Sequence, residues 1–302
     1  MRSLQQTIAL RRRQDRVFHV LGALCTAAGV LVFGALLADL LWHGFARIDW
    51  AFVTSYPSRI AERAGILAAL QGSLAVMVVT AAVAVPLGVA AGVYLEEYAP
   101  KNRLTAIIEI NIANLAGVPS VIYGLMALGV LVYVFGLGPT VLTAGLTLAA
   151  LILPVVIVAT REALRAIPRS IREASHALGA TQWETVRWHL LPYSLGGIAT
   201  GVILGLSRAI GETAPLVTIG ALAYVAFPLP GPIRAEPPFL SFAWLDARFT
   251  VLPIQMFNWV SRPDQAFHAN AAATGVVLLG LTLGMNAVAI LVRSRMRKRI
   301  QW

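Results

Sequence analysis

The chain has 302 residues, of which 58% are hydrophobic and 13% are charged, and its mean hydropathy is +0.75. A soluble globular domain cannot keep so apolar a composition in solution, so the sequence indicates a polytopic membrane protein. The formal net charge is +10, and the presence of a single cysteine, Cys25, excludes an intrachain disulfide.

Six apolar stretches are long enough to cross a membrane, which takes about 20 residues per helix. The first stretch is too long for the core of a cleavable signal peptide, so we predict that it stays as an anchor. We therefore predict an all-α fold of six transmembrane helices. The stretches cover residues 17–42, 68–95, 116–136, 139–160, 195–225 and 271–292.

The basic residues are distributed unevenly between these spans. Of the 24 Lys and Arg residues, 17 fall on the side that holds both chain ends and 6 fall on the other side. Because basic residues collect on the cytoplasmic side, we predict that both termini are cytoplasmic. The charge then sets topology and contacts membrane lipid, and it indicates no nucleic acid partner. The predicted divisions are a cytoplasmic N-terminal tail over 1–16, an anchor helix over 17–42, a periplasmic loop over 43–66, a membrane core over 67–293 and a basic cytoplasmic tail over 294–302.

The connections between the spans differ in length and composition. EEYAPKNR, residues 96–103, has charges of both signs and a proline, which is typical of a short inner turn. FGLGPT, residues 135–140, predicts a tight hairpin between the third and fourth spans. The proline-rich FPLPGPIRAEPPF, residues 227–239, cannot form a regular helix and lies on the outer side.

The inner loop between the fourth and fifth spans, residues 161–194, carries clear helix signals. Ser170 followed by Glu173 predicts a capping box, and Gly179 predicts a left-handed turn that ends this helix. Thr181 followed by Glu184 predicts a second capping box and a helix that runs toward Pro192. The loop is therefore expected to form a compact pair of helices that projects into the cytoplasm. Glu173 acts either as a capping partner only or also as a contact for another protein.

Two charged residues, Arg208 and Glu212, interrupt the fifth span. On a continuous helix both would share a narrow face with Gly197, Gly201 and Gly205, and small residues of this kind permit close helix contacts. Pro215 is expected to break the helix beside Glu212. Charges at membrane depth usually face protein or a cavity. The two residues therefore form either an i, i+4 ion pair used for packing or part of a transport path.

Several stretches resemble known transport permeases. The sequence EAS at Glu173, Ala174 and Ser175, with a following glycine and a Leu-Pro pair, is similar to the EAA loop of ABC importer permeases, although His189 replaces the usual aliphatic residue. RAIGETAPL, at 208–216, resembles the signature of PstA-type permeases of phosphate-specific ABC importers. The other matching segments are AVPLGVAAGVYLEEYA at 84–99, LAGVPSVIYGL at 115–125 and FTVLPIQMFNWVSRP at 249–263.

The resemblance implies a type I ABC importer permease fold, with the core over 67–293, that moves inorganic phosphate across the bacterial inner membrane by alternating access. It implies as partners a second, PstC-type permease, a cytoplasmic PstB-type ATPase dimer that uses the ATP, and a periplasmic PstS-type phosphate-binding protein. The implied translocation path contains Arg208, Gly211, Glu212 and Pro215, and the implied coupling loop contains Glu173, Ala174, Ser175, Gly179, Leu191 and Pro192.

The chain itself is not expected to be an enzyme. It has no phosphate-binding GxxxxGK[ST] motif, and its five histidines lack metal-ligand spacing, so we expect no catalytic residue, metal or cofactor in this chain. Three other functions stay open. The permease could carry another oxyanion, such as sulfate, molybdate or phosphonate. The chain could act alone as an ion-coupled carrier, or it could be a membrane scaffold or sensor that transports nothing.

Overall fold

The structure is a computed structural model that describes residues 2–298, apart from 222–223, 226, 232–238 and 240. Within these residues the chain is almost entirely helical, and the only strand pairing there is an isolated bridge between Thr140 and Arg248. The all-α class is therefore confirmed. Part of the proline-rich stretch 227–239 and the end of the tail 294–302 lie outside the described residues.

The helices follow one another with short connections over most of the chain. Within the described residues there are also three π-helical turns, and one 3₁₀ turn that precedes the second long helix. In chain order the elements are α1 Arg2–Phe45, α2 Trp50–Thr54, the 3₁₀ turn Ala61–Arg63, α3 Leu67–Val93, the π turn Tyr94–Tyr98, α4 Arg103–Leu115, α5 Ser120–Ala127, the π turn Leu128–Val134, α6 Val141–Arg165, α7 Arg169–Ala177, α8 Gln182–Thr185, the π turn Val186–Leu190, α9 Leu191–Ile210, α10 Ala214–Thr218, α11 Leu252–Val260 and α12 Ala266–Lys298.

In the part of the chain that the structure describes, five helical segments are long and apolar enough to cross a membrane, and a bent pair of helices provides a sixth when it is counted as one span. The bent pair joins Arg103–Leu115 to Ser120–Val134 at an angle of 105°. The six predicted spans therefore correspond to these five helical segments and the bent pair. The five segments are Gln14–Phe45, Leu67–Tyr98, Val141–Arg165, Gln182–Ile210 and Ala266–Arg295.

The third span is not the uninterrupted helix that we predicted over 116–136. The chain bends before Ser120, because Pro119 has no N–H to donate and disfavours a helical conformation at the residue before it. The Tyr123 hydroxyl donates a hydrogen bond of 2.8 Å to the carbonyl oxygen of Leu115 across the bend. This bond fixes α4 and α5 relative to each other.

The fifth span was predicted over 195–225, and these boundaries are wrong at both ends. The helical segment begins at Gln182 and ends at Ile210. It passes through Pro192 because the preceding turn, Val186–Leu190, widens to a π turn. The wider turn accommodates proline, which has no backbone N–H to donate. It ends early because Gly211 terminates α9 and a separate short helix follows.

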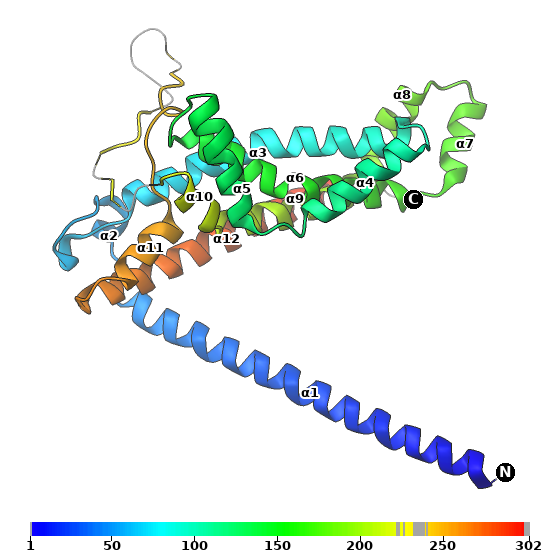
Figure 1. Ribbon diagram of the computed structural model, residues 1–302, viewed down its shortest axis with the longest axis horizontal. Helices are drawn as coiled ribbons and strands as arrows, with labels where there is room; N and C mark the ends of the chain where they lie inside the picture. Colours follow the sequence, from blue (N-terminus) through cyan, green and yellow to red (C-terminus); the bar gives the residue numbers. More distant parts are fainter. Residues whose placement is uncertain (1, 222–223, 226, 232–238, 240, 299–302) are drawn as a thin grey trace.

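The centre of the fold is α6, which packs between α3 and α9 (Figure 1). Glycines bring these helices close together. A Cβ atom added at Gly92 on α3 would lie 2.6 Å from the Cβ of Thr160, and one added at Gly88 would lie 2.6 Å from Val156 Cγ1. The main buried cluster fills the space between these helices, α10 and α11.

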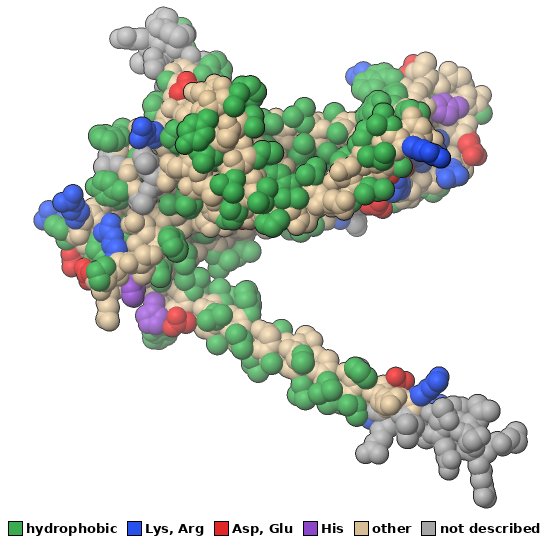
Figure 2. Space-filling view, viewed as in Figure 1, with side chains coloured by type: hydrophobic (Ala, Val, Ile, Leu, Met, Phe, Trp, Pro, Cys, Tyr) green, Lys and Arg blue, Asp and Glu red, His purple; other side chains and the backbone are tan. Residues whose placement is uncertain are grey.

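The first helix stands apart from this bundle. In Figure 1, only the C-terminal end of α1 packs on the bundle, against α12, and the rest of the helix extends away from it. The apolar window within Gln14–Phe45 has no buried residue in the chain alone, and Phe18 and Phe33 are exposed. Figure 2 shows hydrophobic side chains along α1 and along the middle of the bundle, with charged side chains gathered toward the ends. This distribution is typical of helices that cross a bilayer.

Candidate functional site

The predicted break beside Glu212 is confirmed. Gly211 caps the C-terminus of α9, and α10 begins at Ala214 with Pro215 in its first turn. Pro215 is buried against α5, where a Cβ atom added at Gly124 would lie 2.6 Å from Pro215 Cα. The absence of a side chain at Gly124 therefore allows the short helix to sit directly on α5.

The glycines of α9 face α6, as the small-residue pattern predicted. A Cβ atom at Gly197 would lie 2.6 Å from Ala163 Cβ, and one at Gly205 would lie 3.5 Å from Ile152 Cβ. Ile152 is near the middle of α6, so Arg208, about one turn beyond Gly205, also lies at membrane depth.

Arg208 and Glu212 do not form the i, i+4 ion pair that was one interpretation of the sequence. Among the described residues, no carboxylate lies within 4.0 Å of the Arg208 guanidinium, and the guanidinium donates no hydrogen bond to any of them. The helix ends between the two residues, so the spacing of a continuous helix no longer applies. In the chain alone Arg208 is exposed and Glu212 is half-exposed.

A polar contact fixes α9 just before Arg208. The Ser207 hydroxyl donates to the side-chain carbonyl oxygen of Asn286 on α12 at 2.5 Å. Hydrogen bonds between polar side chains are a common link between helices in a membrane. The contact therefore sets the position of the α9 end, and with it the direction in which Arg208 leaves the helix.

The first helix of the inner loop starts earlier than predicted. Pro168 is the N-cap of α7, and no side-chain capping bond is formed there, so the capping box between Ser170 and Glu173 is wrong. The fixed φ of −55° at Pro168 starts the helix at Arg169, which places Ser170 inside the first turn. Glu173 is exposed and, within the described part of the chain, has no hydrogen bond or ion pair.

The turn and the second capping box agree with the prediction. Gly179 has a φ of +85°, which is the left-handed conformation expected after a helix. The Thr181 side chain accepts from the Glu184 N–H, and the Glu184 carboxylate accepts from the Thr181 N–H. The helices α7 and α8 therefore form a compact pair at one end of the molecule (Figure 1).

The exposed residues of this pair include small and apolar side chains beside polar ones such as Glu173 and His176. Ala174 and Ala177 are exposed on α7, and Leu178 is 90% exposed. Ser175 points the other way and is 5% exposed.

Leu191 and Pro192 are not in a separate loop helix. Both are partly buried within the continuous helical segment that begins at Gln182. Leu191 and Trp183 line an apolar cavity of about 650 Å³ against the inner part of α3. The two predicted residues therefore connect the loop to the α9 span. His189, where the sequence departs from the resembling permeases, is exposed.

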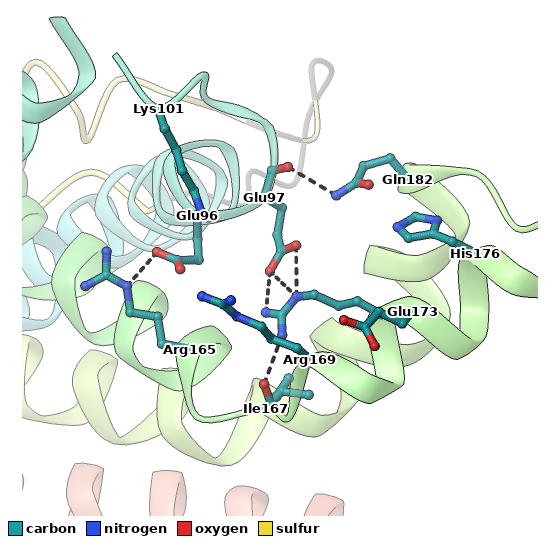
Figure 3. Close-up of a pocket in the computed structure, with 10 residues that line it drawn as sticks. Glu96, Glu97, Lys101, Arg165, Ile167, Arg169, Glu173, His176 and Gln182 are labelled. Atoms are coloured by element: carbon teal, nitrogen blue, oxygen red, sulfur yellow. Dashed lines mark hydrogen bonds and ion pairs between the residues drawn. The ribbon is translucent and has the colours of Figure 1, made fainter. Parts of the chain in front are cut away.

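A group of ion pairs at the same end of the molecule was not predicted. Arg161 lies 2.6 Å from Glu109 and 3.5 Å from Glu96, and its side chain is 8% exposed. Arg165 lies 2.8 Å from Glu96, and Arg172 lies 2.6 Å from Glu97 (Figure 3). In the sequence these arginines count only among the basic residues that indicate topology. The sequence signal for the ion pairs is the spacing of four residues between Arg161 and Arg165, together with the adjacent Glu96 and Glu97 at the end of the second span.

No metal site is formed by the residues that the structure describes, since no group of three or more His, Cys, Asp or Glu side chains could hold an ion there. The ion-pair group instead surrounds a cavity of about 680 Å³, whose lining includes Glu97, Arg172 and Gln182 (Figure 3).

Comparisons with known proteins agree with this description. Residues 84–298 match the family of the Binding-protein-dependent transport system inner membrane component. The Probable ABC transporter permease protein YqgI of Bacillus subtilis (strain 168) is 34% identical, over 70% of this chain and 72% of its own length. The Phosphate transport system permease protein PstA of Mycobacterium leprae (strain TN) is 33% identical, over 83% of this chain and 79% of its own length. An inward-facing conformation of the MetNI methionine ABC transporter is similar in fold, with a TM-score of 0.58 at 19% identity over 76% of this chain and 94% of that one.

Proposed function

Because this chain belongs to the family of binding-protein-dependent transport system inner membrane components, we propose that it is the PstA-type permease subunit of an ATP-driven importer of inorganic phosphate. It is a multi-pass protein of the inner membrane with the fold of a type I ABC importer permease. In this proposal both termini are cytoplasmic, and the loop that contains α7 and α8 faces the ATPase.

The observation that carries the proposal is the exposed position of Arg208 at membrane depth. A guanidinium in contact with lipid near the centre of a helix costs about 2.5 to 3.5 kcal/mol on insertion scales. Within the described residues this chain supplies no carboxylate to offset that cost. Arg208 therefore faces a second permease or a water-filled path rather than lipid. A planar guanidinium with several donors is well suited to bind the oxygens of phosphate.

The broken helix contributes to the same path. Irregular backbone at membrane depth is tolerated where it is buried in protein or lines a cavity. Gly211 and Glu212 form such a segment, and Pro215 anchors its far end against α5. In the proposed mechanism, Arg208 attracts the anion and Glu212 opposes tight retention. Substrate release then follows when the helices tilt.

The partners follow from the same proposal. A PstC-type permease covers the open face of α9, a PstB-type ATPase dimer binds the α7 and α8 pair, and a PstS-type protein delivers phosphate from the periplasm. The absence of a capping role for Glu173 supports the ATPase contact, because its carboxylate is exposed together with Ala174 and Leu178. The bound ATP belongs to the partner and not to this chain.

The test is uptake of labelled phosphate in cells that carry either the wild-type chain or Arg208→Gln in place of the native permease. We expect the wild type to restore uptake that phosphate inhibits but sulfate and molybdate do not. Arg208→Gln should insert normally yet lose uptake by roughly thirtyfold or more, the equivalent of a lost charged contact of about 2 kcal/mol.

The matched control is Arg59→Gln, which removes an exposed arginine outside the predicted spans and should leave uptake unchanged. Inhibition by sulfate or molybdate would indicate a different oxyanion. Normal uptake in Arg208→Gln would exclude this arginine from the path. An importer that works without any ATPase would instead be an ion-coupled carrier, and a chain that binds the partners but restores no uptake would be a scaffold or sensor.

A further inference from the structure

Two kinds of contact hold the inner end of α3 against the loop. Val93 packs in an apolar cluster with Ile171 and Val186, and Glu97 forms polar contacts with the loop helices. The Glu97 side chain is 5% exposed and accepts three hydrogen bonds from Arg172 of α7, two from Nε at 3.2 and 3.3 Å and one from Nη2 at 2.6 Å. Its backbone carbonyl oxygen accepts a fourth from Gln182 Nε2 at 3.1 Å. Among the described residues, every hydrogen bond and ion pair between residues 168–182 and 94–98 ends on Glu97.

The same Arg172 side chain also holds the end of α6. Its Nη1 donates to the carbonyl oxygen of Ile167 at 2.9 Å, and its Nη2 donates to that of Leu164 at 3.0 Å. The carbonyl oxygen of Leu164 also accepts from the backbone N–H groups of Ala166 and Ile167, so Arg172 adds a further bond at the end of this helix. One guanidinium therefore connects the loop helix to the inner ends of two membrane-spanning helices.

A cavity lies beside the contact between Glu97 and Arg172. Its volume is about 680 Å³, and it lies between the end of α3 and the loop (Figure 3). The apolar cluster around Val93 packs α3 against the loop elsewhere, and beside the cavity the bonds to Glu97 form the contact. Charge-assisted bonds of this kind are strong, and a sheltered pair is little screened by salt.

We infer that Glu97 and Arg172 are positioning residues that make α7 and the inner end of α3 move as one body during transport. When the ATPase displaces the loop, the pair pulls α3 and α6 together and so opens or closes the path beside Arg208. The inference rests on the proposed function, because it requires the loop to be the element that the ATPase moves. Lysine cannot replace Arg172, because a single ammonium lacks the planar fork that reaches both the carboxylate and the two carbonyls.

A distance measurement tests this directly. In a Cys25→Ser background, spin labels are attached at Ser170→Cys on α7 and Leu87→Cys on α3, two exposed positions. The complete complex in nanodiscs is measured by pulsed electron paramagnetic resonance with and without ATP. We expect one narrow distance in the wild type that does not change with ATP. Arg172→Lys should broaden this distance, or shift it by several ångströms when ATP is added.

The matched control is Arg169→Lys. Arg169 lies near the pair on the same helix but, in the described part of the chain, has no carboxylate within 4.0 Å. This variant should keep the wild-type distances. A second readout is the amount of phosphate moved per ATP hydrolysed, which should fall about tenfold in Arg172→Lys but not in Arg169→Lys.

Three results would overturn the inference about Glu97 and Arg172. An unchanged distance distribution in Arg172→Lys overturns the inference, and so does a wild-type distance that shifts with ATP. Loss of the ATPase from the purified variant overturns it as well, because the pair would then shape the docking surface. If the distances behave as expected while the wild-type complex moves no phosphate, the proposed function fails and the coupling of α7 to α3 stands.

Discussion

The hydroxyl oxygens of Ser175 on α7 and Thr185 on α8 lie 2.9 Å apart, and both side chains are buried. Thr185 also donates to the carbonyl oxygen of Thr181 at 3.0 Å, so Ser175 supplies the proton for the contact between the helices. This pair is the polar contact that holds α7 against α8. Ser175 therefore fixes the shape of the helix pair from within.

Replacing Ser175 with alanine should loosen the helix pair. The loss of one hydrogen bond typically costs about 1 kcal/mol, which corresponds to roughly fivefold faster hydrogen exchange of the α7 amides where exchange follows local opening. The measurement is hydrogen exchange by mass spectrometry on the purified protein. Ser170→Ala is the control, since Ser170 is exposed and forms no capping bond. Equal exchange in the two variants would contradict the role given to Ser175.

A second prediction concerns the contact between α3 and α6. Gly92→Ala places a Cβ atom 2.6 Å from Thr160 Cβ, where neither backbone can yield easily. Such overpacking typically costs about 1–3 kcal/mol, so the thermal midpoint of the purified protein should fall. Gly22→Ala on α1 is the control, because no atom lies within 4 Å of an added Cβ there. A midpoint that falls equally in both variants would mean that helix contact at Gly92 is not the cause.

The accuracy of the sequence predictions depended on how local the determining interaction was. The capping box at Thr181 and the left-handed turn at Gly179 involve residues within one turn of each other, and both are present. The break before Pro215 also follows from local backbone chemistry. The capping box at Ser170 failed because Pro168 offered a competing helix start two residues earlier.

The interactions that were missed join distant parts of the chain. Glu97 and Arg172 are 75 residues apart in sequence, and Arg165 lies 69 residues from Glu96. No period or motif relates such positions, because their contact depends on how α3 packs against α6. The position of Arg208 was predicted only in part. The glycines of its predicted face pack on α6, whereas the Arg208 side chain is exposed, and the loss of the pair with Glu212 depends on the exact end of α9.

A third prediction tests the exposed face of α7. Ala174→Lys introduces a long charged side chain beside Leu178, where a bound ATPase would exclude water. Burying an unpaired charge in an interface costs several kcal/mol, so the ATPase should no longer co-purify and uptake should stop. Ala51→Lys is the control, because Ala51 is an exposed helical alanine in α2, far from α7 (Figure 1). Normal uptake by Ala174→Lys would contradict a docking role for this face.

The last prediction concerns Glu212, which follows the end of α9 and is half-exposed. In the proposed path its negative charge opposes the attraction of Arg208 for an anion, so that phosphate is held only briefly. Glu212→Gln removes the charge and keeps the shape and one hydrogen-bond acceptor. An anion should then bind more tightly and leave more slowly.

We therefore expect Glu212→Gln to lower the maximal rate of phosphate uptake while the phosphate concentration for half-maximal uptake also falls. A change of about 1.4 kcal/mol in binding corresponds to about tenfold in the affinity. Protein amounts in the membrane should stay normal, because Glu212 has no ion pair to lose within the described residues. Glu62→Gln, an exposed glutamate in the short 3₁₀ turn, is the matched control. If Glu212→Gln instead fails to accumulate, its carboxylate stabilises the fold, and the release step must depend on another residue.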